Sequence, residues 1–138
     1  MKVLIVDDSK TIRINMQRLM HRIELDADAV DSGPAALAYL AEHSVDLVVT
    51  DFNMPHMNGI ELIAEIRKLP KMRFKPIVVL SSESDRAKFR QAKDAGALAW
   101  MVKPDNERDL INVVRHVMPM AVNAAAAARC EEAGGTTA

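Results

Sequence analysis

Residues 47–51 read LVVTD, an apolar run rich in β-branched residues that ends directly on an acidic side chain. The apolarity is continuous rather than alternating, which is typical of a strand that is buried on both faces, as in a parallel sheet. Four further runs have this character, although the second is weaker: residues 3–6, 28–30, 77–80 and 99–102. The sequence therefore predicts five buried, parallel strands.

Helical patterns lie between these strands. Ser32-Gly33-Pro34 supplies an N-cap and an early proline for a helix that runs to about Glu42, and Asp85 can cap another that ends near Gly96. Other helical stripes are formed by Ile12, Met16, Leu19 and Ile23, by Leu62, Ile63, Ile66 and Leu69, and by Leu110, Val113, Val114 and Val117. Alternating strands and helices fold as a parallel sheet with helices on both faces. We therefore expect an α/β fold, a doubly wound five-stranded parallel sheet of flavodoxin-like order 2-1-3-4-5 with five helices, and a ligand crevice beyond the carboxyl ends of the strands.

The 138 residues have the size of one domain. We expect a folded domain over residues 1–119 and a flexible C-terminal tail over residues 120–138, where the apolar periodicity dissolves. A formal net charge of -1 provides no global field to attract nucleic acid or an anionic membrane. With no recognisable signal peptide or apolar run of about 20 residues, we expect a cytoplasmic protein. The single cysteine, Cys130, fits a reducing compartment.

Polar side chains follow four of the predicted strands. Asp7 and Asp8 follow the first, Asp51 the third, Ser81 the fourth and Lys103 the fifth. Each residue alone can be interpreted as a helix cap, a strand end or a solvated charge. Because the carboxyl ends of parallel strands meet at one edge of the sheet, their joint occurrence favours a functional site.

Three clustered carboxylates repel one another unless a cation or a lysine lies among them. Mg²⁺ prefers hard oxygen ligands, commonly one or two carboxylates together with waters and phosphate oxygens. Asp8 and Asp51 can supply carboxylates, Asp7 can hold a metal-bound water, and the backbone carbonyl of Asn53 can complete the protein's share. The sequence therefore predicts Mg²⁺ as a cofactor.

The Asp51 carboxylate can attack phosphorus and form an acyl phosphate. A metal ion and the Lys103 ammonium would neutralise charge on the transferring phosphoryl group, and a carboxylate ionised at neutral pH needs no general base. The histidines show no metal-ligand spacing and are interpreted as surface residues: His21, His43, His56 and His116.

With these residues in place, the chain resembles response-regulator receiver domains, and particularly the single-domain CheY-like chemotaxis regulators, over roughly residues 2–118. The resemblance is carried by VDDS at residues 6–9, TDFNMPHMNG at 50–59, LSS at 80–82, DAGA at 94–97 and KP at 103–104. It implies two-component phosphotransfer signalling, in which a CheA-like histidine kinase provides a phosphoryl group that Asp51 accepts in a Mg²⁺-dependent reaction. The receiver itself would catalyse its phosphorylation and dephosphorylation, without turnover of an external substrate.

The resemblance also implies a switch. The Ser81 hydroxyl would turn inward to bond a phosphoryl oxygen, and Trp100 would change rotamer with it. The surface around the fourth helix, fifth strand and fifth helix would then change its affinity for an output protein, such as a flagellar motor switch component or a phosphatase. Asn53 and Glu83 flank the path of the hydrolytic water in this family, so we expect rapid loss of the phosphate.

Two groups of basic residues are typical of solvated faces, although an acidic partner surface is an alternative. One is on the predicted fourth helix, with Arg86, Lys88, Arg90 and Lys93; the other follows the third, with Arg67, Lys68, Lys71, Arg73 and Lys75. Nucleic acid is a less favoured partner, because the chain has no recognition-helix module.

Two other functional classes compete with a receiver. An aspartyl-phosphate hydrolase also uses a nucleophilic aspartate, but its chemistry usually needs a second acid two residues later, where this chain has Asn53. A flavodoxin-like nucleotide or flavin binder needs a glycine-rich, phosphate-binding loop after the first strand, whereas residues 7–11 read DDSKT.

Overall fold

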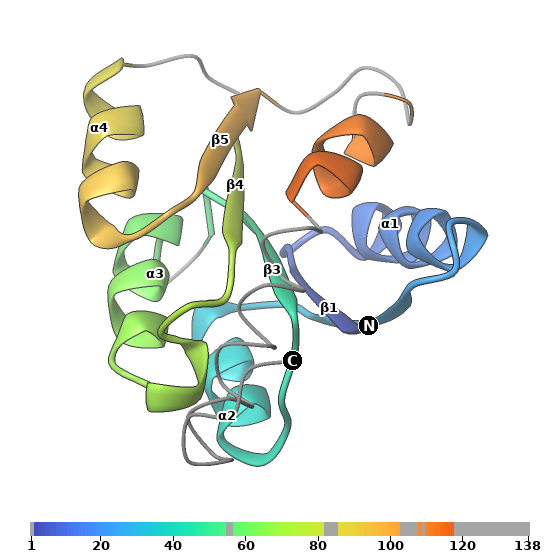
Figure 1. The fold of residues 1–138 in the computed structure, drawn as a ribbon, viewed down its shortest axis with the longest axis horizontal. Coiled ribbons are helices and arrows are strands. Elements are labelled where there is room, and N and C mark those ends of the chain that lie inside the picture. Colours follow the sequence, from blue (N-terminus) through green and yellow to red (C-terminus); the bar gives the residue numbers. More distant parts are fainter. Residues whose placement is uncertain (1, 55–56, 82–85, 103–107, 109, 118–138) are drawn as a thin grey trace, which may run out of the picture.

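The computed structural model describes residues 2–54, 57–81, 86–102, 108 and 110–117. Its elements are β1 (Lys2–Val6), α1 (Lys10–Arg22), β2 (Asp26–Val30), α2 (Gly33–Glu42), β3 (Leu47–Asp51), α3 (Gly59–Arg67), the 3₁₀ turn η1 (Pro70–Met72), β4 (Ile77–Ser81), α4 (Arg86–Ala95) and β5 (Ala99–Val102). Residues 110–117 form a fifth helix (Figure 1). The strands pair in parallel in the order β2-β1-β3-β4-β5, which confirms the predicted fold.

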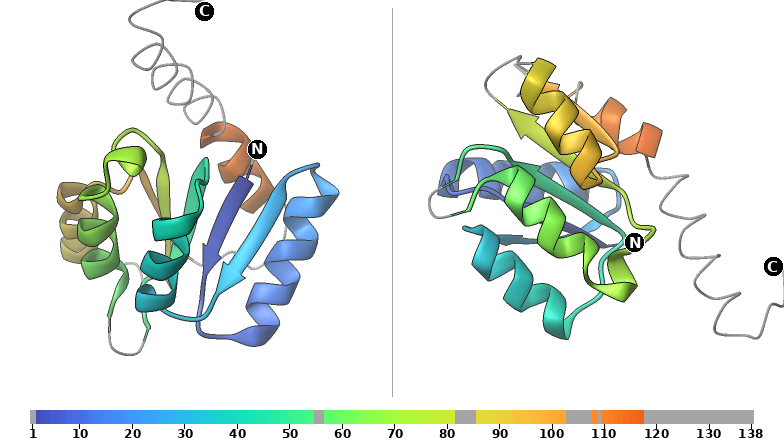
Figure 2. Two further views of the ribbon diagram at one scale, coloured as in Figure 1. Left: turned by 90° about the horizontal axis from the view of Figure 1, so that it is seen from below. Right: turned by 90° about the vertical axis from the view of Figure 1, so that its left-hand side faces the viewer.

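The sheet has a hydrophobic core on each face. Alternate residues of β1 point to opposite faces, so that Leu4 and Val6 pack with α2, α3 and α4, whereas Val3 and Ile5 pack with α1 and the fifth helix. Figures 1 and 2 show the two helical layers on either side of the sheet. Because both faces are covered, β3 and β4 are buried along their whole length, and this explains their continuous apolar sequences.

Helices begin shortly after the carboxyl ends of the strands, where polar side chains cap them. The Ser9 and Ser32 hydroxyls accept hydrogen bonds from the backbone of Ile12 and Ala35, at 3.5 and 3.2 Å. The predicted bounds of α2 and the predicted end of α4 are confirmed, whereas the proposed cap Asp85 lies outside the described residues. None of the helices in the described part of the chain is long and apolar enough to cross a membrane.

Arg67 belongs to the second group of basic residues, which were predicted to be solvated or to contact an acidic partner. Its guanidinium instead binds main-chain carbonyls of this chain. Its Nε and Nη2 atoms donate to the Gly96 carbonyl at 3.1 and 2.6 Å, and Nη1 donates to the carbonyls of Met72 and Lys75 at 2.5 and 2.6 Å. Burial lowers the pKa of this guanidinium from its ordinary value. Arg67 therefore links the end of α3 to the turns that precede β4 and β5.

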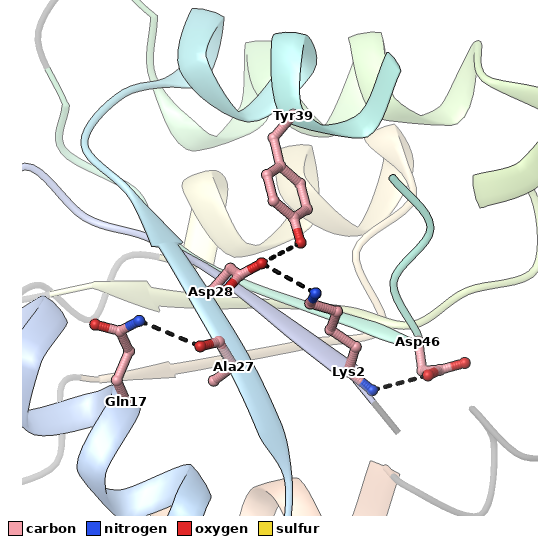
Figure 3. Close-up of polar contacts among 6 residues, drawn as sticks. All are labelled: Lys2, Gln17, Ala27, Asp28, Tyr39 and Asp46. Carbon is pink, nitrogen blue, oxygen red and sulfur yellow. Dashed lines mark hydrogen bonds and ion pairs between the residues drawn. The ribbon is translucent and has the colours of Figure 1, made fainter. Parts of the chain in front are cut away.

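A polar network attaches the edge strand β2 to its neighbours (Figure 3). The Lys2 ammonium lies 3.1 Å from Asp28 Oδ2, and the Tyr39 hydroxyl donates a hydrogen bond to the same oxygen. On the other side, Gln17 Nε2 donates to the Ala27 carbonyl at 3.2 Å. Side chains from β1, α1 and α2 thus hold β2 in register.

Candidate functional site

Three carboxylates converge at the carboxyl edge of the sheet. The pairing of Val6 with Thr50 places the next residues, Asp7 and Asp51, side by side where β1 and β3 end. One oxygen from each of Asp7, Asp8 and Asp51 lies within 4.8 Å of the others. The residues that the sequence predicted as an acidic cluster are therefore brought together.

Backbone contacts hold Asp7 in the loop between β1 and α1. Its N–H donates to the Val30 carbonyl at 3.2 Å, its Oδ1 accepts from the Ser9 N–H at 2.9 Å, and its carbonyl accepts from Arg13 Nη1 at 2.7 Å. Asp7 is 1% exposed, whereas the neighbouring Asp8 is exposed. The Asp7 carboxylate is thus buried and held in place, whereas Asp8 is exposed to solvent.

Asp51 is the last residue of β3 and is 4% exposed. The following backbone is fixed on both sides, because the Phe52 N–H donates to Leu80 and the Phe52 carbonyl accepts from the Gly59 N–H, both at 2.9 Å. A Cβ atom on Gly59 would lie only 3.0 Å from the Asp51 carbonyl oxygen and 3.1 Å from the Phe52 Cα. The start of α3 can therefore approach the candidate acceptor because residue 59 has no side chain.

The remaining predicted site residues lie around this cluster or outside the described residues. Ser81 is fully buried at the end of β4, one residue beyond Leu80, which pairs with Asp51. Asn53 is exposed two residues after Asp51, and Trp100 is partly buried on β5. Lys103 and Glu83 are outside the residues that the structure describes.

The donor set fits a hard divalent cation. Two of the three carboxylates are buried, so their mutual repulsion is less screened by water than on an open surface. Oxygen ligands of this kind suit Mg²⁺, which usually takes one or two carboxylates and keeps several waters. The described site contains no histidine or cysteine in the cluster, so a softer metal has no matching ligands there.

Phe52 lies next to the candidate acceptor and was not singled out from the sequence. Its ring centroid lies 5.2 Å from that of Trp100, with the ring planes inclined at 51°, and Lys88 Nζ lies over the Phe52 ring at 5.1 Å from the centroid. An aromatic residue directly after the predicted acceptor was the available signal. The contacts themselves depend on tertiary packing between β3, α4 and β5.

Comparison with known proteins identifies the family. The sequence-family model described as the response regulator receiver domain matches residues 3–115 of this chain. The chain belongs to this family. This receiver is 34% identical over 116 residues to the two-component response regulator ORR8 of Oryza sativa subsp. indica, covering 83% of this chain and 96% of the relative.

Solved structures share the fold of this receiver. The chemotaxis response regulator CheY4 of Vibrio cholerae superposes with a TM-score of 0.80 and 33% identity, covering 84% of this chain and 97% of that one. The response regulator TrrA of Thermotoga maritima, solved in complex with Mg²⁺ and BeF, gives a TM-score of 0.75 and 28% identity with the same coverage. The protein is thus a receiver domain of two-component signalling with CheY-like structural neighbours.

Proposed function

We propose that this receiver accepts a phosphoryl group on Asp51 from a histidine kinase, with Mg²⁺, and thereby changes its affinity for a partner protein. The observation that supports this most directly is the position of Asp51, buried at the end of β3 with an oxygen within 4.8 Å of those of Asp7 and Asp8. A nucleophilic carboxylate beside a hard-cation site is the arrangement that phosphoryl transfer to aspartate requires.

The site residues divide the chemistry between them. A carboxylate oxygen of Asp51 forms a bond to phosphorus while the bond from phosphorus to the kinase histidine breaks, and the histidine keeps that electron pair. Asp8, Asp51 and the Asn53 backbone carbonyl would hold Mg²⁺ directly, and Asp7 would hold it through a water. When bound there, the ion would neutralise negative charge on the phosphoryl oxygens. The Lys103 ammonium would add one further positive charge.

A change in partner affinity would then pass from the phosphoryl group to the protein surface. The Ser81 hydroxyl bonds a phosphoryl oxygen, Trp100 changes rotamer, and the surface of α4, β5 and the fifth helix changes its partner affinity. Asn53 and Glu83 admit the hydrolytic water, so the phosphate is short-lived. The receiver thus catalyses its own phosphorylation and dephosphorylation, and it turns over no external substrate.

We place this receiver in the cytoplasm and assign the receiver domain to residues 1–119. The predicted tail, residues 120–138, lies outside the described residues. The CheY-like neighbours support chemotaxis or motility signalling, with a CheA-like kinase upstream and a motor switch component or phosphatase downstream. ORR8, which is a two-component response regulator from a plant, shows that the family extends beyond bacteria.

Phosphorylation at Asp51 is tested with a small phosphodonor. Incubation with acetyl phosphate and Mg²⁺ should add one phosphoryl group to the native chain, detected by intact-protein mass spectrometry at neutral pH. Asp51→Asn and native protein in excess chelator should gain none, because the first lacks the nucleophile and the second the metal. Equal labelling of the native chain and Asp51→Asn would contradict the proposal.

A further inference from the structure

The Phe52 ring connects the candidate acceptor to two structural elements at once. It follows Asp51 directly, it is 7% exposed, and it contacts Trp100 on β5 and the Lys88 ammonium on α4. Ring faces carry negative potential and attract cations, whereas inclined aromatic pairs are favoured over parallel stacking. Both contacts of Phe52 therefore have attractive geometry.

The position of this ring depends on the backbone of the acceptor. Hydrogen bonds to Leu80 and from Gly59 hold Phe52 on both sides, and the Cα of Phe52 lies close to Gly59. The backbone that carries the ring is therefore fixed relative to Asp51. In contrast, Lys88 belongs to α4, which packs on the sheet through side chains, and Trp100 belongs to β5, which pairs with β4.

We propose that Phe52 and Lys88 are positioning residues for Trp100, and that they transmit the charge on Asp51 to the indole through the Phe52 ring. This inference rests on the proposed function, because it supplies a second connection between Asp51 and Trp100 beside the one through Ser81. Neither Phe52 nor Lys88 is assigned to the phosphoryl-transfer reaction itself.

The coupling is electrostatic. Phosphorylated Asp51 carries about 1.5 to 2 negative charges at neutral pH, in place of the single charge of the carboxylate beside Phe52. That charge attracts the Lys88 ammonium and competes with the ring face for it. The cation–π contact between Lys88 and Phe52 therefore weakens. Trp100 then loses part of the support that keeps it against Phe52. Removing the Lys88 charge should reproduce part of this change without any phosphate.

Trp100 is the single tryptophan of the chain, so its fluorescence is a specific readout. The native protein is compared with Lys88→Met, Lys88→Arg and Phe52→Leu, before and after addition of beryllofluoride with Mg²⁺. Lys93→Met is the matched control, because it removes one positive charge from an exposed position on the same helix. Acetyl phosphate labelling of Asp51 is measured in every variant.

Lys88→Met and Phe52→Leu should each make the beryllofluoride-induced fluorescence change about two- to fivefold smaller, the factor expected from one cation–π or aromatic contact. Lys88→Arg, which keeps the cation, and Lys93→Met should respond as the native chain does, and all variants should still be labelled at Asp51. A response of Lys88→Met equal to that of Lys93→Met would overturn the inference. Absence of labelling in the native chain would instead refute the proposed function.

Discussion

At the residue scale, Asp28 is the centre of a network whose strength depends on pH. The hydrogen bond from Tyr39, and then that from Lys2, hold the pKa of Asp28 below its ordinary value of 3.8, and the charge of His43 acts in the same direction. The folded state therefore favours the ionised carboxylate. Its contribution to stability is present above the ordinary pKa and is lost as the pH falls through the lowered pKa.

Asp28→Asn should lower the free energy of unfolding at pH 7 by less than about 1 kcal/mol, because the side chain is partly exposed and solvent screens the charge. The difference from the native protein should shrink at pH 3, below the ordinary pKa, because protonation of this carboxyl in the unfolded chain then reduces the contribution. Urea unfolding at the two pH values measures this. Asp26→Asn, an exposed change on the same strand, is the control, and an equal effect of Asp28→Asn at both pH values would contradict the expectation.

At the scale of elements, Arg67 joins α3 to the turns before β4 and β5. Its partners are carbonyl groups, so truncation leaves several acceptors without their donor in a half-buried site. Arg67→Met should therefore lower the free energy of unfolding by about 2 to 4 kcal/mol. Arg67→Lys should recover only part of this loss, because an ammonium lacks the planar fork that reaches separate carbonyls.

The control for Arg67 is its neighbour Lys68, which forms an exposed ion pair with Glu65 at 2.8 Å. Lys68→Met should cost less than about 1 kcal/mol, as is usual for surface pairs. Urea unfolding at neutral pH compares the three variants. If Arg67→Met and Lys68→Met were equally stable, the assigned role of the guanidinium would be wrong.

At the scale of the whole molecule, we expect the acidic cluster to make stability depend on divalent cations. Mg²⁺ at about 100 times its dissociation constant should raise the free energy of unfolding by about 2.7 kcal/mol, because only the folded chain assembles the site. Asp8→Asn should unfold at a higher temperature than the native chain without metal, since it relieves repulsion, and should gain less from Mg²⁺.

Thermal unfolding with Mg²⁺ or with NaCl of matched ionic strength separates binding from screening. Asp94→Asn, an exposed change at the end of α4, should gain from Mg²⁺ as much as the native chain does. A gain from Mg²⁺ in Asp8→Asn as large as the native gain would exclude Asp8 as a ligand.

Much of this architecture could be predicted because its causes are local in the sequence. Continuous apolar runs marked the buried strands, and acidic residues at their ends marked the edge where Asp7, Asp8 and Asp51 meet. Arg67 and Phe52 could not be assigned in this way, since their partners come from turns and strands far along the chain. The roles of Lys103 and Glu83 stay predictions, because these residues lie outside the described part of the chain.

The link made by Arg67 also determines where this protein can tolerate mutation. Its acceptors are main-chain oxygens, which every amino acid provides, so the identity of residue 75 is not constrained by that contact. Gly96 differs, because it has a φ of 117° and a Cβ there would lie 2.8 Å from Arg67 Nε. Of the three residues that accept from Arg67, Gly96 alone has its identity constrained, by its own backbone conformation and by the closeness of the guanidinium.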